Sequence, residues 1–118
     1  MIVDDEEGIR ENLFNILKER GYLVCLAKDG EEALMKIRNS SYHCIILDIK
    51  LPKIDGITVL KEAKRIDPKV IVIVITGYDL PYLLKEAKNL SAYACLRKPI
   101  DIAQLLSLIE EASGYAYQ

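Results

Sequence analysis

Histidine and cysteine are scarce in this chain. It has one histidine, His43, and three cysteines, Cys25, Cys44 and Cys95, with no Cys-x-x-Cys spacing among them. Each cysteine lies within an apolar run, which favours a small core residue in a reducing compartment over a disulfide or metal ligand. With a single histidine, the chain also has almost no ligands for a zinc site.

Long hydrophobic runs and concentrations of one charge are also missing. The longest purely apolar stretch, Val70–Ile75, is far too short to cross a bilayer. Acidic residues directly follow Met1–Val3, so we expect no signal peptide. The 16 Lys and Arg are scattered and the net charge is −2, which argues against nucleic-acid binding by this segment. We therefore expect a cytoplasmic protein without membrane contact.

The composition that remains is that of an ordinary globular domain. The chain has 118 residues, of which 51% are hydrophobic and 29% charged. This length predicts a single domain, residues 1–118, that buries roughly two-thirds of its unfolded surface and needs no covalent staples.

Short apolar runs alternate with segments of helical periodicity along the whole chain. The predicted strands are Met1–Val3, Tyr22–Ala27, Cys44–Leu47, Val70–Ile75 and Ala92–Leu96. The predicted helices are Glu7–Arg20, a segment capped by Asp29 and Glu32, Ile57–Ile66, a segment beginning at Asp79-Leu-Pro-Tyr, and a segment after Asp101. This alternation predicts a three-layer, doubly wound α/β domain around a mostly parallel sheet of five strands.

Charged and hydroxyl residues directly follow most of the predicted strands. The first is followed by Asp4-Asp5-Glu6-Glu7, the third by Asp48, the fourth by Thr76-Gly77 and the fifth by Arg97-Lys98-Pro99. The carboxyl ends of parallel strands meet at one edge of the sheet, where such domains place their sites. We therefore expect these side chains to converge.

The converging residue types favour phosphoryl chemistry. Clustered carboxylates repel one another unless a cation binds among them, and oxygen ligands without His or Cys suit Mg²⁺. A carboxylate beside Mg²⁺ can act as a nucleophile toward a phosphoryl group and form an acyl phosphate. Thr76 and Lys98 are suited to bind phosphoryl oxygens.

Four motifs resemble the receiver domain of bacterial two-component response regulators. They are Val3-Asp4-Asp5-Glu6, Ile46-Leu47-Asp48 with Pro52 and Asp55-Gly56, Thr76-Gly77, and Lys98-Pro99. The similarity runs from Val3 to about Ala112. It implies the flavodoxin-like strand order 2-1-3-4-5, of which this family is a standard example.

The resemblance also implies roles for individual residues. Asp48 is expected to accept the phosphoryl group, Thr76 to act as the switch hydroxyl and Lys98 to sense the phosphate. The expected Mg²⁺ ligands are Asp4, Asp5, Asp48 and the backbone carbonyl of Lys50. The expected partner is a sensor histidine kinase or a phosphotransfer protein. The implied protein is a signalling domain that catalyses only its own phosphorylation and dephosphorylation.

The output face implied by the resemblance lies near the end of the chain. It comprises Gly77 to Leu90, Ala92 to Lys98 and the helix after Asp101, and it is also the expected surface for a homodimer. The sequence names neither the kinase nor an output domain.

Some positions depart from the family pattern. Cys95 stands where an aromatic residue is usual; we hypothesise that Tyr93, expected on the same strand face, or Tyr78 replaces it. Ser91 stands where glycine is common, and the first strand is short. Lys50 and Tyr78 are placed to influence the lifetime of the phosphate.

Three alternatives compete with this interpretation. A flavodoxin-like cofactor module needs a phosphate loop after the first strand, where Asp4 to Glu7 would repel phosphate. A phosphohydrolase needs an acid two residues after its nucleophile, and Lys50 occupies that position. A degenerate receiver that acts only as a docking or dimerisation module is the third; the set of Asp5, Asp48, Thr76 and Lys98 argues against it, and Cys95 keeps it open.

Overall fold

The computed structural model describes residues 1–77 and 81–116, with side chains as far as Ser113. Within these residues strands and helices alternate. The strands are β1 (Ile2–Val3), β2 (Leu26–Ala27), β3 (Cys44–Asp48), β4 (Ile71–Thr76) and β5 (Ala94–Arg97). The helices are α1 (Glu7–Glu19), α2 (Gly30–Asn39), α3 (Gly56–Ile66), α4 (Pro81–Asn89) and α5 (Ile102–Ala116).

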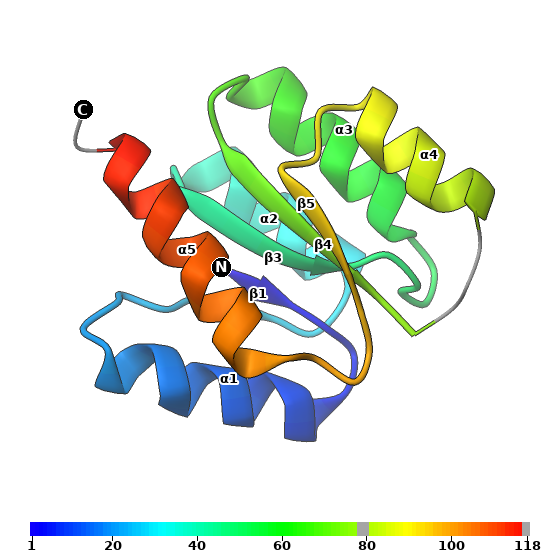
Figure 1. Ribbon diagram of the computed structural model, residues 1–118. Helices are drawn as coiled ribbons and strands as arrows, with labels where there is room; N and C mark the ends of the chain where they lie inside the picture. Colours follow the sequence, from blue (N-terminus) through cyan, green and yellow to red (C-terminus); the bar gives the residue numbers. More distant parts are fainter. Residues whose placement is uncertain (78–80, 117–118) are drawn as a thin grey trace.

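The strands form one parallel sheet in the order β2-β1-β3-β4-β5 (Figure 1). Helices α1 and α5 cover one face of this sheet, and α2, α3 and α4 cover the other. The expected three-layer α/β fold with strand order 2-1-3-4-5 is therefore confirmed.

The two central strands are apolar at nearly every position because both of their faces are buried. In β4, Val72 and Val74 enter the core beneath α2, α3 and α4, whereas Ile73 and Ile75 enter the core beneath α1 and α5. This alternation follows from the two-residue period of a strand. It holds the carboxyl end of β4 rigidly between two packed layers.

Aspartate side chains fix the starts of three helices. Asp29 accepts a hydrogen bond from the Glu32 N–H at 2.8 Å at the start of α2, as its sequence pattern predicts. Asp55 accepts one from the Thr58 N–H at 2.9 Å ahead of α3, and Asp101 one from the Gln104 N–H at 3.1 Å ahead of α5. The predicted start of the fourth helix, at Asp79 and Leu80, lies outside the described residues.

The second strand is shorter than its apolar sequence predicts. The run Tyr22–Ala27 contributes only Leu26 and Ala27 to β2. Its neighbour β1 offers only Ile2 and Val3 as pairing residues, and a strand extends only as far as its partner does. The prediction for this segment was therefore wrong in length and correct in place.

Candidate functional site

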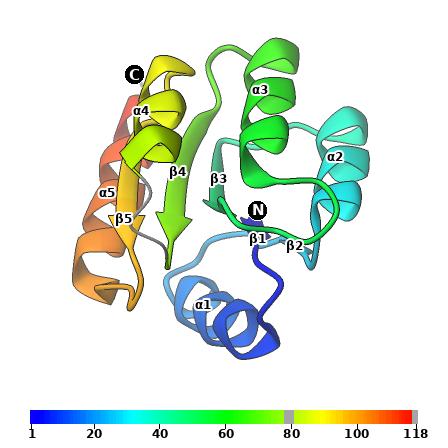
Figure 2. The ribbon, with the colours of Figure 1, turned by 90° about the vertical axis from the view of Figure 1, so that its right-hand side faces the viewer.

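The carboxyl ends of the strands bring together the polar residues that the sequence places there. Asp4 follows β1, Asp48 ends β3 and Thr76 ends β4, and each is at most 4% exposed. Lys98 follows β5, and its side chain is 17% exposed. Figure 2 shows β4 and β5 running in the same direction toward this edge. Buried polar groups are costly without partners, so the packing of these residues requires mutual pairing.

Three carboxylates form a compact oxygen cluster at this edge. One carboxylate oxygen from each of Asp4, Asp5 and Asp48 lies within 4.8 Å of the other two. Asp4 and Asp48 are buried and Asp5 is exposed, so the cluster has one side open to solvent. An all-oxygen donor set of this kind fits a hard divalent cation such as Mg²⁺.

The ammonium of Lys98 lies among carboxylates. Its Nζ is 3.0 Å from Asp48 Oδ2, 3.1 Å from Asp4 Oδ2 and 3.2 Å from Glu6 Oε1. The contact with Glu6 was not expected from the sequence, although Glu6 is the third consecutive acid after β1. Lys98 thus offsets part of the negative charge of the cluster.

Burial and pairing shift the pKa of both central groups. Burial is the main reason that the pKa of Asp48 is raised; the charge of Asp4 adds to the effect, and the hydrogen bond from Lys98 opposes it. Burial by itself lowers the pKa of Lys98, but hydrogen bonds and attraction to Asp48 and Asp4 outweigh it, so the pKa is raised. Negative charge at Asp48 is therefore only partly compensated by the lysine.

Backbone groups fix the orientation of the two buried carboxylates. The Lys50 N–H donates to Asp48 Oδ1 at 3.1 Å, and the Glu6 N–H donates to Asp4 Oδ1 at 2.9 Å. Arg10 donates to the Asp4 carbonyl at 2.8 Å and so ties α1 to the end of β1. In each carboxylate, Oδ1 therefore accepts a hydrogen bond from the backbone, and Oδ2 faces the Lys98 ammonium.

The Asp55-Gly56 motif has a steric explanation at the base of the site. A Cβ at Gly56 would lie 2.5 Å from the Asp48 carbonyl oxygen and 2.5 Å from Ile49 Cα. The Gly56 N–H donates to the Ile49 carbonyl at 2.8 Å. Only glycine allows α3 to begin this close to the backbone of Asp48 and Ile49.

The ends of β4 and β5 are linked through Thr76 and Lys98. The Lys98 N–H donates to the Thr76 carbonyl at 2.8 Å, and the Lys98–Pro99 peptide bond is cis. A Cβ at Gly77 would meet the Lys98 side chain at 3.6 Å, an ordinary contact distance. The backbones of the two strand ends are therefore held together at the site.

The expectation that Tyr93 shares a strand face with Cys95 is wrong. Cys95 packs against the core beneath α2, α3 and α4, whereas Tyr93 packs against the core beneath α1 and α5. Strand β5 begins at Ala94, so the alternation of a strand does not extend back to Tyr93. Tyr78, the other candidate for the missing aromatic, lies outside the described residues.

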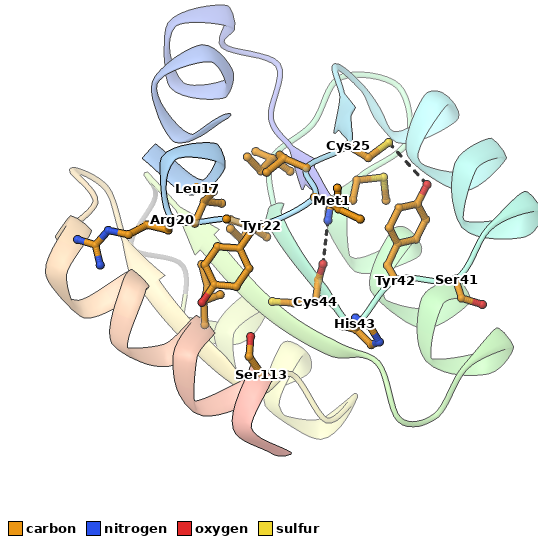
Figure 3. Close-up of a pocket in the computed structure, with 16 residues that line it drawn as sticks. Met1, Leu17, Arg20, Tyr22, Cys25, Ser41, Tyr42, His43, Cys44 and Ser113 are labelled. Atoms are coloured by element: carbon orange, nitrogen blue, oxygen red, sulfur yellow. Dashed lines mark hydrogen bonds between the residues drawn. The ribbon is translucent and has the colours of Figure 1, made fainter. Parts of the chain in front are cut away.

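The three cysteines are unbridged and only partly buried, at the edges of the two cores. Cys25 and Cys44 line a hollow at the amino ends of the strands (Figure 3). Burial raises the pKa of the Cys95 thiol and raises that of Cys44 to about 11. Thiols with raised pKa values are poor nucleophiles at neutral pH.

Among the described residues, no helix is long and apolar enough to span a membrane.

Comparisons with known proteins agree with this fold and identify the family. The sequence profile described as "Response regulator receiver domain" matches residues 1–110. The chain is 34% identical over 111 residues to sporulation initiation phosphotransferase F of Bacillus subtilis, covering 94% of this chain and 90% of that protein. It is 31% identical over 117 residues to the transcriptional regulatory protein ZraR of Escherichia coli, covering 99% of this chain and 26% of ZraR.

Solved structures of receiver domains have the same fold as this chain. A CheY-like response regulator receiver domain protein from Methanospirillum hungatei superposes with a TM-score of 0.90 at 34% identity, covering 93% of this chain and 88% of that one. A receiver domain protein from Clostridium thermocellum gives a TM-score of 0.91 at 30% identity, covering 98% of this chain and 94% of that one.

The doubly wound fold, with an acidic cluster and a lysine at the carboxyl ends of its strands, places the chain in the class of α/β domains that carry their site at that edge of the sheet. This chain belongs to the response regulator receiver domain family of two-component systems. Receiver domains bind Mg²⁺ at an acidic pocket and interact with histidine kinases or phosphotransfer proteins. The chain spans 90% of the Bacillus relative but only 45% and 26% of two other relatives.

Proposed function

We propose that this receiver domain accepts a phosphoryl group on Asp48 from a phosphohistidine of a sensor kinase or phosphotransfer protein. One observation supports this assignment above the others. The Asp48 carboxylate lies at the end of a buried strand, within reach of two further carboxylates and an ammonium. The resemblance of the Ile46-Leu47-Asp48 motif to that of receiver domains also supports Asp48 as the acceptor.

The acceptor is oriented for attack before any donor arrives. The Lys50 N–H holds Asp48 Oδ1, so Oδ2 is the oxygen that turns toward Lys98 and the open side of the cluster. In the proposed step an Asp48 oxygen forms a bond to phosphorus while the P–N bond of the donor phosphohistidine breaks. The histidine leaves with the electron pair of that bond and takes up a proton.

The chain's own oxygen atoms are suited to hold Mg²⁺ during this transfer. We propose as ligands the carboxylates of Asp4, Asp5 and Asp48 and the backbone carbonyl of Lys50. When bound, the ion supplies positive charge that reduces repulsion between these carboxylates and an incoming phosphoryl group.

Lys98 and Thr76 are the proposed links between phosphorylation and a change in shape. A phosphoryl group on Asp48 brings new oxygen atoms to the place where the Lys98 ammonium now pairs with that carboxylate. We propose that the ammonium pairs with one phosphoryl oxygen and that the Thr76 hydroxyl donates to another. The hydrogen bond between their backbones carries both shifts into β4 and β5.

The proposed output face consists of α4, β5 and α5; β5 is an edge strand, and the two helices flank it at that edge of the sheet (Figure 2). Tyr82 on α4 is 65% exposed and is available to a partner or to a second copy of the domain. Leu105, Leu106 and Ile109 are buried and serve the core instead. The proposed contact area therefore depends on α4 more than on the apolar side of α5.

Intact-mass spectrometry tests the proposed acceptor. After incubation with acetyl phosphate and MgCl₂, we expect the wild-type chain to gain about 80 Da, the mass of one phosphoryl group. The variant Asp48→Asn should gain nothing, whereas Asp55→Asn, which keeps a capping side chain at α3, should gain the same mass as wild type. An equal gain in Asp48→Asn would exclude Asp48 as the acceptor.

A further inference from the structure

The ammonium of Lys98 is matched by three carboxylates. Its Nζ lies 3.0 Å from Asp48 Oδ2, 3.1 Å from Asp4 Oδ2 and 3.2 Å from Glu6 Oε1. A lysine ammonium has three N–H donors and no acceptor. Another oxygen atom, such as one from a phosphoryl group, therefore reaches Lys98 by displacing one of these carboxylates.

The three partners of Lys98 differ in how firmly they are held. The side chains of Asp4 and Asp48 are only 4% and 5% exposed, and Oδ1 of each accepts a backbone N–H. The side chain of Glu6 is 60% exposed, and its contact with the ammonium is the longest of the three. Exposed ion pairs are weak because water and salt screen them. Glu6 is therefore the partner that is most easily displaced.

The backbone of Glu6 holds its carboxylate beside the site. The Glu6 N–H donates to Asp4 Oδ1 at 2.9 Å, and the Glu6 carbonyl accepts from the Arg10 N–H at 3.1 Å. Glu6 is the N-cap residue of α1, a position whose side chain commonly accepts a hydrogen bond from the first helical turn. In the described part of the chain the Glu6 side chain makes no such bond, and it reaches Lys98 instead.

Glu6 also stands apart from the carboxylates that we propose for Mg²⁺. The oxygen cluster consists of Asp4, Asp5 and Asp48 and does not include Glu6. The Glu6 carboxylate is therefore available to Lys98 whether or not the oxygen atoms of the cluster are engaged.

A phosphoryl donor meets the charge of Glu6 as it approaches. The Glu6 and Asp48 carboxylates contact the same ammonium, so Glu6 lies within two hydrogen-bond lengths of the acceptor oxygen. Small phosphoryl donors are anions, and like charges at this separation repel. Their oxygen atoms also seek the ammonium that Glu6 occupies. Glu6 thus opposes an anionic donor both by repulsion and by competition for Lys98.

We propose that Glu6 is a positioning residue that acts through Lys98: its carboxylate holds the ammonium until a phosphoryl oxygen replaces it, which slows phosphorylation by small anionic donors. This inference rests on the proposed role of Asp48 as the acceptor. The effect is on the rate of phosphoryl uptake and not on folding, because an exposed ion pair adds little stability.

The rate of uptake from acetyl phosphate tests this role. In that reaction an Asp48 oxygen bonds to phosphorus while the P–O bond to the acetyl group breaks, and acetate leaves with the electron pair. Wild type, Glu6→Gln and Glu7→Gln are compared by time-resolved intact-mass spectrometry at a saturating concentration of MgCl₂. Glu7 is exposed and follows Glu6 directly, so Glu7→Gln removes the same formal charge one residue away.

The salt dependence separates an electrostatic role from a structural one. At an ionic strength of about 0.1 M, where the Debye length is about 10 Å, Glu6→Gln should take up the phosphoryl group about fivefold faster than wild type. At about 1 M, where the Debye length is about 3 Å, the difference should fall below about twofold. Glu7→Gln should stay within about twofold of wild type at both ionic strengths.

Three results overturn the proposal, and a fourth overturns the proposed function with it. Equal or slower uptake in Glu6→Gln at low salt would show that Glu6 does not withhold Lys98. The same acceleration in Glu7→Gln would show an effect of net charge alone, and an acceleration that salt leaves unchanged would show a structural effect. Absence of the adduct from wild type itself would remove the acceptor role of Asp48. Faster uptake that is confined to Glu6→Gln and weakened by salt supports the proposal.

Discussion

The ammonium of Lys98 lies 3.0 Å from Oδ2 of Asp48, the carboxylate that we propose as the phosphoryl acceptor. The same ammonium also contacts Asp4 at 3.1 Å, so it pairs with two of the three carboxylates in the cluster. The ammonium thus pairs with carboxylates that we propose as Mg²⁺ ligands. Binding of the ion is therefore expected to compete with the lysine for these groups.

We predict that Lys98→Met binds Mg²⁺ more tightly than wild type. Methionine keeps an apolar side chain at this position but removes the charge that neutralises Asp4 and Asp48. The dissociation constant should fall by about tenfold, equivalent to roughly 1.4 kcal/mol. Titration with MgCl₂, followed by calorimetry or by the amide resonances of Glu6 and Lys50, measures it.

The control for this prediction is Lys85→Met on α4. Lys85 is exposed, and its replacement removes the same formal charge outside the cluster. Its Mg²⁺ affinity should match that of wild type. Weaker binding in Lys98→Met would show that the lysine organises the ligands and does not compete with the ion.

Asp48→Asn should raise the free energy of unfolding in the absence of Mg²⁺. The folded protein raises the pKa of Asp48, mainly through burial, so its charged form carries a penalty at pH 7. The amide removes that penalty, while Lys98 keeps Asp4 and Glu6 as partners. The gain should be about 1 kcal/mol, a typical size for a point mutation.

Urea unfolding followed by circular dichroism at several pH values measures this effect. A group with a raised folded pKa adds stability below its unfolded pKa, here 3.8, and loses it as pH rises through the folded value. The advantage of Asp48→Asn over wild type should therefore be present at neutral pH and shrink as pH falls. A loss of stability at neutral pH would show that the Lys98 pair outweighs the cost of burial.

Periodicity and position predicted most of the fold and the location of the site. Strands such as β3 and β4, apolar on both faces, can be recognised because burial leaves no polar position in them. The convergence of Asp4, Asp48, Thr76 and Lys98 followed from the parallel direction of the strands alone.

Two features escaped sequence reasoning for a common physical reason. Glu6 reaches Lys98 across 92 positions of sequence, and such a contact depends on how the β5–α5 connection turns. Tyr93 lies one residue before β5 begins, where the side chains no longer follow the alternation of a strand. Local patterns define the interiors of strands and helices, whereas tertiary packing decides what lies just beyond their ends.

The thiol of Cys44 should make stability depend on pH in the alkaline range. Burial raises its pKa in the folded protein to about 11, from an ordinary value of 9.0. Below pH 9.0 the thiol is neutral in both states; above it only the unfolded state loses the proton, so stability falls as pH rises toward about 11. Relative to Cys44→Ala, wild type should lose roughly 2 kcal/mol across this window.

Unfolding of wild type and Cys44→Ala in urea at about pH 8 and about pH 10.5 gives this difference. Subtracting the variant removes the contribution of the lysines and tyrosines that titrate in the same range. Equal pH dependence in the two proteins would show that the thiol ionises as readily in the folded chain as in the unfolded one.

Helices α1 and α4 end in the same hydrogen-bonded turn, but with different residues at its left-handed position. At α1 this position is Gly21, with φ of 88°. The Gly21 N–H donates to the Lys18 carbonyl, and the Tyr22 N–H donates to the Leu17 carbonyl. At α4 the position is Ser91, with φ of 67°; its N–H donates to the Lys88 carbonyl, and the Ala92 N–H donates to the Ala87 carbonyl. This pattern favours glycine because a Cβ is strained at positive φ.

Ser91→Gly should therefore stabilise the domain, and Gly21→Ala should destabilise it, each by about 1 kcal/mol. A Cβ at Gly21 would meet nothing within 4 Å, so its cost would be conformational and not steric. Urea midpoints at an unchanged m-value measure both changes in one series. A loss of stability in Ser91→Gly, with the expected loss in Gly21→Ala, would show that the serine side chain gains more from its surroundings than the backbone strain costs.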